Sequence, residues 1–336
     1  MLEAVIPFTA ERFGRAIIMP NLSPEPVTTT ERLRAYRQRI QKAIGSSPFI
    51  PLMTYYLTDN SSPTEITEGF KSGEAAAVKL YPAGATTNSD LGITKIENAY
   101  PVFEAMEEAG MPVLMHGERV RDDAGNDIAP PDREKAFLDA VLPGILRRFP
   151  RLKIVLEHAT TKDAVDFVSN DTSGRLAATI TAHHLILSSE EIRRAEKPAY
   201  VHCLPVVKSQ KDREALRKAA TSGDSHFFLG TDSAPHPMSA KEKPEGYPAG
   251  IFTAPAGIEL YAHVFGEEGK LENLEAFASL NGPAFYTLPP NEEKITLEEN
   301  PWTINSPVAL KDGGSVYPLG YNENPSKRLT IAWKLA

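Results

Sequence analysis

The sequence predicts an α/β fold of the barrel kind, built on a parallel sheet whose faces are covered. Short apolar runs recur at residues 15–21, 49–57, 75–82, 111–117, 152–159, 176–181 and 226–232. Between several of these runs lie segments with apolar residues three and four apart, which is typical of amphipathic helices. Strands that are apolar on both faces and alternate with helices are typical of parallel sheets. The length of 336 residues suits one large domain of this kind.

The helical pattern is clearest in four of the connecting segments, which are residues 30–44, 96–110, 133–149 and 212–223. After about residue 288 the chain becomes rich in proline and irregular, with 315–321 and 328–335 as candidate peripheral strands. We therefore expect a barrel domain over residues 1–290, with seven recognisable strand–helix units. We expect residues 291–336 to form a C-terminal extension that packs on the barrel.

The overall composition limits the class of protein. A net charge of −8 without a long basic run argues against a general nucleic-acid binder. The single cysteine excludes an internal disulfide and fits a reducing compartment. No apolar run approaches the roughly 20 residues that a bilayer crossing needs, and the first residues lack the pattern of a signal peptide. We therefore expect a cytoplasmic protein with no membrane partner.

Polar side chains stand at the ends of five predicted strands, which end in Asn21, Lys79, His116, His158 and Asp232. In parallel α/β folds, the side chains at the carboxyl ends of the strands converge. Neighbouring members of the last four are about one strand–helix unit apart, except that one strand intervenes before the aspartate. Imidazole and carboxylate are ligands that zinc accepts, and a catalytic zinc keeps one position open for water. The same ligands also accept other first-row ions.

Each of these residues also has a purely structural interpretation. A lone histidine after a strand is more often a hydrogen-bonded core residue than a ligand. Asp232 could cap the next helix, and Lys79 could extend its amine to the surface. A buried lysine with a depressed pKa could instead react with carbon dioxide, and the resulting carbamate could bridge two metal ions. The loop of residues 84–88 has the small residues expected of a segment that moves over a ligand.

Several strings occur in the order found in one known family: "RAIIMPNL", "KLYPAGATTN", "VLMHGE", "LEHATTKDAVDFV", "CLPVVK", "FLGTDSAPH" and "SLNGPAFYTLP". They resemble the dihydroorotases of pyrimidine biosynthesis, specifically the short, free-standing type within the amidohydrolase superfamily. The match runs from about residue 5 to residue 290. The resemblance implies a (β/α)8 barrel of the TIM type, holding two zinc ions bridged by a carboxylated lysine and a hydroxide.

The resemblance also implies roles for individual residues. The metal ligands would be Lys79 (carboxylated on its amine and bridging), His116, His158 and Asp232, and Asp232 would also be the general base and acid. The substrate contacts would be Asn21, the backbone of Leu204, Ala234, His236 and Ala254. Thr86 and Thr87 would belong to a mobile loop that covers the substrate.

The implied reaction is the reversible hydrolysis of (S)-dihydroorotate to N-carbamoyl-L-aspartate in de novo synthesis of UMP. A metal-bound hydroxide would attack the ring amide, and Asp232 would pass its proton to the departing nitrogen. Asn21 and His236 are the visible candidates for holding the substrate carboxylate. The implied partners are this small-molecule substrate and a second copy of the chain, as a homodimer.

One departure from the family pattern concerns the metal site. Family members begin with a strand that carries a His-x-His pair, followed two residues later by an arginine. None of the 8 histidines here forms such a pair. His183 and His184 are adjacent, and on a strand they would point to opposite faces. We therefore expect the first barrel strand to be missing, two unpaired sheet edges, and fewer than two zinc ions per chain.

Three explanations of this departure remain open. The sequence could be an incomplete copy of a normal enzyme. It could be a naturally shortened form, weak or inactive, that serves as a binding or regulatory partner of a full-length copy. Finally, other residues could complete the site, although losing two ligands should leave a metal loosely held.

Two further classes of function compete with the dihydroorotase interpretation. Another cyclic-amide hydrolase, of the hydantoinase or allantoinase type, would share the lysine, the two histidines and the aspartate. The strings "KLYPAGATTN" and "GTDSAPH" favour dihydroorotate as the substrate. A protein without enzymatic activity could use the same scaffold, or the histidines could be structural residues of an unrelated α/β protein.

Overall fold

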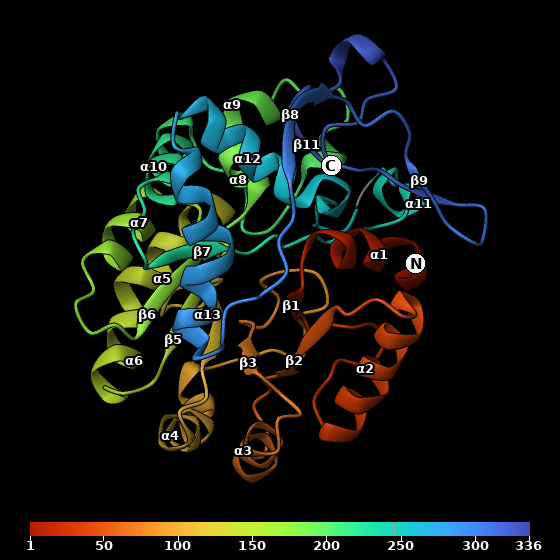
Figure 1. Ribbon diagram of the computed structural model, residues 1–336. Helices are drawn as coiled ribbons and strands as arrows, with labels where there is room; N and C mark the ends of the chain where they lie inside the picture. The colour runs from red at the N-terminus through yellow and green to blue at the C-terminus, as the bar shows by residue number, and fades with distance from the viewer. Residues whose placement is uncertain (245) are drawn as a thin grey trace.

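The computed structural model describes residues 1–244 and 246–336. Its central element is a parallel sheet in which the strands follow one another in chain order, from β1 to β7 (Figure 1). The strands are β1 Arg15–Ile18, β2 Ile50–Tyr56, β3 Ala77–Leu80, β4 Val113–His116, β5 Ile154–Glu157, β6 Leu176–Ile180 and β7 Phe227–Leu229. All seven predicted strands are confirmed, and each is shorter than its apolar run.

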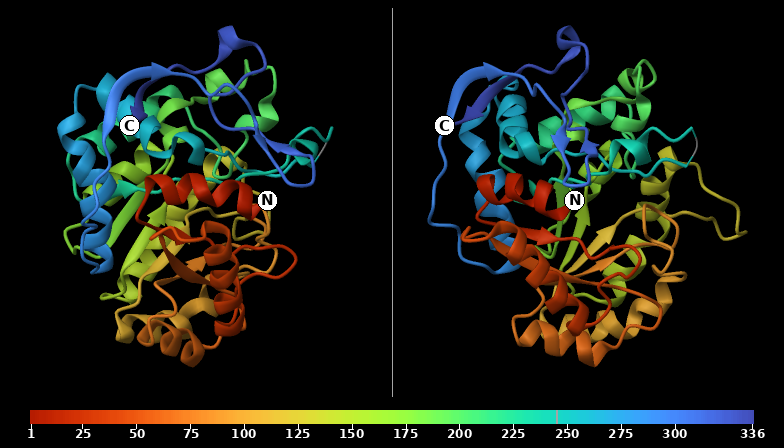
Figure 2. Two further views of the ribbon diagram at one scale, coloured as in Figure 1. Left: turned by 45° about the vertical axis from the view of Figure 1, so that its right-hand side comes forward. Right: turned by 90° about the vertical axis from the view of Figure 1, so that its right-hand side faces the viewer.

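Helices follow the strands and lie around the outside of the curved sheet (Figures 1 and 2). The longer ones are α1 Leu2–Arg12, α2 Thr30–Ile44, α3 Pro63–Lys71, α4 Tyr100–Ala109, α5 Arg133–Ala140, α6 Leu142–Arg148, α7 Lys162–Ser169, α10 Gln210–Thr221 and α12 Gly257–Glu267. The short ones are α8 Ala182–Ile186, α9 Ser189–Ile192, α11 Met238–Lys241 and α13 Asn281–Tyr286. The four predicted helices are confirmed, although 133–149 forms two helices that meet just before Pro143, which lacks a backbone N–H. Helix α1 was not predicted.

Hydroxyl side chains fix the start of several helices close to the strand ends. Thr161 accepts a hydrogen bond from the backbone N–H of Ala164 at the start of α7, which follows β5. Thr181 does the same for His184 at the start of α8, which follows β6. Each bond satisfies a backbone donor that the first turn of a helix leaves free. The loops that leave β5 and β6 are therefore short and fixed.

The interior of the curved sheet is filled by a small apolar cluster. Its buried members come from successive strands and are Ala77, Leu114, Val155, Ala177 and Phe228. Phe285 and Tyr286, from the end of α13, pack against this cluster. Lys153, just before β5, donates hydrogen bonds to the carbonyl of Phe285 at 2.9 Å and to the hydroxyl of Thr287 at 3.0 Å. The end of α13 therefore closes the barrel at the amino ends of the strands.

The sheet described here does not close on itself, because its order begins at β1 and ends at β7. The prediction of two sheet edges is therefore confirmed. At the β7 edge, the side-chain amide of Asn281 donates to the carbonyl of Phe227 at 3.0 Å. At the β1 edge, the guanidinium of Arg15 donates to the carbonyl of Pro289. The segment that begins with α13 thus contacts both edges and satisfies polar groups there.

Residues 291–336 form two small antiparallel pairs beside the barrel. Strand β8 (Leu297–Trp302) pairs with β11 (Ile331–Leu335), and β9 (Val308–Ala309) pairs with β10 (Ser315–Val316). Both predicted peripheral strands are thereby confirmed. Strand β11 lies against α12, and β9 lies against α1 (Figure 2). The division into domains at residue 290 stays a prediction.

Helix α1 is attached to α12 by a buried ion pair. The guanidinium of Arg12 donates to both carboxylate oxygens of Glu259, at 2.8 Å and 2.9 Å. Their side chains are 8% and 1% exposed, so each buried charge needs the other as its partner.

Of the helices in the described part of the chain, none combines the length and apolar character that a bilayer crossing requires.

Replacing Tyr286 with alanine is expected to destabilise the fold, because it removes the aromatic ring that closes the barrel base. A partly buried aromatic side chain should cost about 2 kcal/mol, at the low end for large-to-small substitutions. Urea unfolding, followed by circular dichroism, would measure the change. Tyr286→Phe is the matched control, since it keeps the ring. Equal unfolding midpoints for the alanine variant and the native chain would contradict this account of the base.

Candidate active site

Lys79 lies near the end of β3 and is completely enclosed. Its side chain is 1% exposed and forms an ion pair with the carboxylate of Glu157, the last residue of β5. Its amine also lies 5.0 Å from the centre of the Tyr81 ring. The alternative in which this lysine extends to the surface is therefore wrong. A buried ammonium requires a partner of opposite charge, and Glu157 supplies it.

His116 ends β4 and is oriented by a carboxylate two residues later. Its Nε2 lies 2.7 Å from Oε2 of Glu118, and both side chains are buried. Burial lowers the pKa of His116, and the hydrogen bond to Glu118 partly opposes this shift. A neutral ring that donates from Nε2 carries its lone pair on Nδ1. A carboxylate that accepts from one ring nitrogen in this way prepares the other nitrogen of a histidine to bind a metal.

His158 directly follows β5 and lies beside His116. The centres of the two rings are 4.8 Å apart, and the planes meet at 67°. Burial lowers the pKa of His158 far below its usual range, and the nearby charge of Lys79 lowers it further. Among the described residues, its buried Nδ1 has no hydrogen-bond partner. His158 is therefore not the satisfied core histidine of the structural interpretation.

A buried carboxylate on α5 holds the loop that follows His158. Glu134 accepts a hydrogen bond from the backbone N–H of Thr160 at 2.8 Å and another from the hydroxyl of Thr161. Burial raises the pKa of Glu134, while the charge of Lys208 and these hydrogen bonds oppose the shift. Upstream, the N–H of His158 itself donates to the hydroxyl of Thr179 at 2.8 Å. The position of His158 is thus fixed from both sides.

Asp232 lies three residues after β7, and charged groups of the same site act on it. Its pKa is raised to about 7, chiefly by burial, with the charge of Lys79 lowering it and the charge of Glu157 raising it. The next helix, α11, begins at Met238 and has Pro237 as its N-cap, so this aspartate does not cap it. Asp232 therefore belongs to the same electrostatic group as Lys79 and Glu157.

His158 and Asp232 share an uncommon backbone conformation. Their φ angles are +46° and +41°, in the left-handed region that non-glycine residues rarely occupy. Such a conformation costs about 1–2 kcal/mol, and strained positions of this kind gather at functional sites. His158 directly follows β5, and Asp232 lies three residues after β7. This strained conformation therefore occurs at two of the four predicted metal ligands.

Two of the predicted substrate contacts, Asn21 and His236, come together with Thr87 of the predicted mobile loop around Ala249. The side-chain amide of Asn21 donates to the carbonyl of Thr87 at 3.1 Å. The Thr87 hydroxyl exchanges two hydrogen bonds with the backbone of Ala249, each of 3.1 Å. The Nε2 of His236 donates to the carbonyl of the same alanine at 2.9 Å. Residues far apart in the sequence are thereby linked, and Ala249 was not predicted.

The segment that starts at Ala249 also organises the remaining predicted contacts. The N–H of Ala234 donates to the carbonyl of Ile251 at 2.9 Å. The N–H of Ala254 donates to the hydroxyl of Ser233 at 3.1 Å. The N–H of Gly250 bonds to the carbonyl of His202, two residues before Leu204, at 2.9 Å. Thr86 is held within its own loop, where its N–H donates to the hydroxyl of Ser89 at 2.9 Å.

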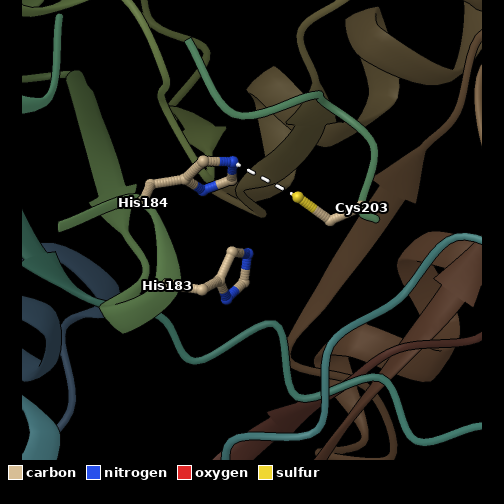
Figure 3. A group of neighbouring side chains, drawn as sticks. All are labelled: His183, His184 and Cys203. Carbon is tan, nitrogen blue, oxygen red and sulfur yellow. Dashed lines mark hydrogen bonds between the residues drawn. The ribbon is translucent and has the colours of Figure 1, made fainter. Parts of the chain in front are cut away.

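The tightest group of possible metal-ligand atoms in the described residues does not include any of the predicted metal ligands. In His183, His184 and Cys203, one donor atom each lies within 4.8 Å of the others, and all three residues are buried (Figure 3). The two histidines lie on helix α8 rather than on a strand, so the expectation that they point to opposite faces is wrong. His116, His158 and Asp232 are not drawn together this tightly in the described part of the chain.

The predicted ligands nevertheless fit a metal centre by their chemistry. His116 and His158 are buried and neutral, and the free Nδ1 of His158 is a lone-pair donor with no other use. Glu118 provides the outer carboxylate that metal-binding histidines usually have. Sequence reasoning missed Glu118, Glu134 and Glu157. An acid within an otherwise apolar run, as in "LEH", was the one signal that could have revealed one of them.

Comparisons with known proteins identify the family to which this chain is similar. The profile of the amidohydrolase family matches residues 9–183. A dihydroorotase of Azoarcus is 50% identical over 336 residues, which cover 100% of this chain and 94% of that protein. The crystal structure of the Saccharomyces cerevisiae dihydroorotase in complex with 5-fluoroorotic acid superposes with a TM-score of 0.89 at 35% identity. That match covers 99% of this chain and 93% of the yeast chain.

A more distant likeness shows the fold alone. The L-hydantoinase of Arthrobacter aurescens superposes with a TM-score of 0.78 but is only 14% identical, and the match covers 100% of this chain and 78% of that one. The barrel architecture is thus shared with hydantoinases, whereas the detailed sequence is not. Taken with the order of strands and the lysine, histidines and aspartate near their carboxyl ends, these similarities show that the chain belongs to the dihydroorotase family of amidohydrolases.

Proposed function

We propose that this chain catalyses the reversible hydrolysis of (S)-dihydroorotate to N-carbamoyl-L-aspartate, a step of de novo pyrimidine biosynthesis. The observation that carries the proposal is the group of Lys79, His116, His158 and Asp232 at the carboxyl ends of barrel strands, of which the first three are buried. In a chain of the dihydroorotase family, this is where the chemistry of a barrel enzyme is expected. Membership of the family also favours a homodimer and a cytoplasmic location.

The proposed metal ligands are His116, His158, Asp232 and a carbamate on Lys79. The carbamate forms when the neutral amine adds to carbon dioxide and loses a proton. When bound, zinc ions would supply a hydroxide at neutral pH and polarise the carbonyl of the ring amide. Glu157 neutralises the ammonium form of Lys79, and it loses this role once the amine becomes a carbamate.

Asp232 has the properties needed to move a proton during the reaction. A general base works best when its pKa lies near the working pH, and the pKa of Asp232 is about 7. Its carboxylate would take the proton of the attacking water and give it to the ring nitrogen as that nitrogen leaves. In ring closure, the same carboxylate would remove the proton from the attacking nitrogen.

The remaining predicted residues would bind and enclose the substrate. Asn21 and His236 are proposed to hold the substrate carboxylate, and both contact the segment around Thr87 and Ala249. The backbone of Leu204, together with Ala234 and Ala254, would contact the substrate. The loop with Thr86 and Thr87 would close over the site and exclude water.

Turnover across a panel of cyclic amides tests the proposal. The metal-loaded chain should hydrolyse dihydroorotate well above hydantoin, dihydrouracil and allantoin. Asp232→Asn should lower kcat for dihydroorotate by about a hundredfold or more, as expected for loss of a general base. Asp163→Asn, at an exposed position on α7, is the matched control. A preference for hydantoin or allantoin would favour the alternative hydrolase, and no turnover of any amide would favour a non-enzymatic role.

His158→Ala should reduce the zinc bound per chain. Removing one of the proposed ligands should leave the ion loosely held, because zinc sites need a full set of donors. Elemental analysis after dialysis against metal-free buffer would measure the loss relative to the native chain. His226→Ala is the control, because both ring nitrogens of His226 are already hydrogen-bonded. Equal zinc contents in all three proteins would exclude His158 as a ligand.

Glu118→Gln should weaken metal binding at His116 without removing a ligand. The amide keeps the size of the carboxylate but loses its charge, so it polarises the imidazole less. Changes of this kind usually cost about 10–100-fold in metal affinity. Zinc affinity would be measured by competition with a chelator, alongside Glu104→Gln, an exposed change on α4. Unchanged affinity in Glu118→Gln would mean that Glu118 is only a structural partner.

A further inference from the structure

His183, His184 and Cys203 form a compact group of donor atoms outside the proposed catalytic residues. The histidines are neighbours on α8, and the cysteine lies on the segment that leads to α10 (Figure 3). One donor atom of each lies within 4.8 Å of the others. The three residues are 0%, 2% and 2% exposed. Nothing in the proposed dihydroorotase reaction uses any of them.

The separation of His184 and Cys203 matches that of two ligands on one metal ion. Nε2 of His184 lies 3.7 Å from Sγ of Cys203. Tetrahedral zinc holds nitrogen at about 2.0–2.1 Å and sulfur at about 2.3 Å, which separates the two ligands by about 3.6 Å. Nδ1 of His184 lies 2.7 Å from the hydroxyl of Thr181. This outer contact is of the kind that orients a metal-binding imidazole.

The ring of His183 gives a second, independent reason to expect a bound ligand. Its two ring nitrogens are buried, and neither has a hydrogen-bond partner among the described residues. Burial lowers the pKa of His183 to about 3, so the ring is neutral and keeps a lone pair. A buried polar group without a partner costs about 1–3 kcal/mol, and most buried polar groups therefore have one. The structure gives this imidazole no use other than to bind a ligand.

We propose that His183, His184 and Cys203 bind a zinc ion, or a similar divalent ion, in a tetrahedral site whose fourth position is open. A thiolate with two imidazoles is a donor set that zinc prefers over harder cations such as magnesium. This site shares no ligand with the proposed catalytic centre, which contains no sulfur ligand. It requires no residue other than those in the group.

Binding of the ion follows a simple proton balance. Without the ion, Nε2 of His184 and the thiol of Cys203 both donate to the carbonyl of Pro205, at 3.2 Å and 3.3 Å. Burial raises the pKa of the Cys203 thiol to about 12, so it is protonated. The ion would displace the thiol proton into solution. His184 would carry its own proton on Nδ1, directed at the hydroxyl of Thr181.

The ion would link two segments that lie next to the proposed substrate. Helix α8 follows β6, and Cys203 immediately precedes Leu204, whose backbone is a proposed substrate contact. An ion shared by both segments would hold the Leu204 backbone in a fixed position. This consequence for substrate binding rests on the proposed function, whereas the ion site does not.

Titration of the metal-free chain with cobalt(II) tests the site without measuring activity. A thiolate bound to cobalt gives an intense near-ultraviolet charge-transfer absorption, which oxygen and nitrogen ligands do not give. Because Cys203 is the single cysteine, this absorption reports on the proposed site alone. At saturating cobalt, the absorption of the native chain should correspond to about one cobalt–thiolate bond per chain. Proton release measured in weakly buffered solution should accompany it.

Variants separate this site from the catalytic centre. Cys203→Ser should abolish the absorption, and His183→Gln should weaken cobalt binding about tenfold or more. His158→Ala should leave the absorption unchanged, since it alters only the proposed catalytic ligands. Circular dichroism would establish that each variant is folded. A folded native chain that shows no such absorption at saturating cobalt would overturn the proposal, whatever its activity toward dihydroorotate.

Discussion

The site depends on one buried ion pair, between Lys79 and Glu157. The interior of the barrel is lined by apolar side chains, and both charged side chains are largely withdrawn from water. The lysine lowers the pKa values of Asp232 and His158, while the glutamate raises that of Asp232. The protonation of the neighbouring groups therefore follows the charge state of this pair. Conversion of the amine to a carbamate would reverse the sign of one partner and change the balance at Asp232.

The strands and the residues at their ends could be predicted, because both depend on short stretches of the sequence. Apolar runs mark the buried strands, and a lysine or histidine at the end of such a run is conspicuous. The acids that support the site could not be predicted in this way. Glu118, Glu134 and Glu157 find their partners through folding, and a carboxylate in a sequence is more often solvent-exposed. Their role depends on burial, which short-range periodicity does not reveal.

Contacts between residues far apart in the sequence could not be predicted either. Ala249 bonds to Thr87 and His236 through its backbone, and Asn21 joins them through the carbonyl of Thr87. The identity of an alanine gives no clue to these contacts. The end of α13 fills the barrel base with side chains from more than a hundred residues after β5. His183 and His184 converge with Cys203 because they lie on a short helix, where a strand would have separated them. In each case, the contact forms because the fold brings distant segments together, and the local sequence does not indicate it.

The two hydrogen bonds between Thr87 and Ala249 have a consequence for how often the loop opens. Each bond contributes about 0.5–1.5 kcal/mol net, so together they favour the closed loop by about 1–3 kcal/mol. At equilibrium, roughly 1% to 15% of molecules would then have the loop released. Under the proposal that this loop covers the substrate, such a minority would be large enough for ligands to enter and leave without a separate trigger. It would be small enough that most molecules hold the site covered at any instant.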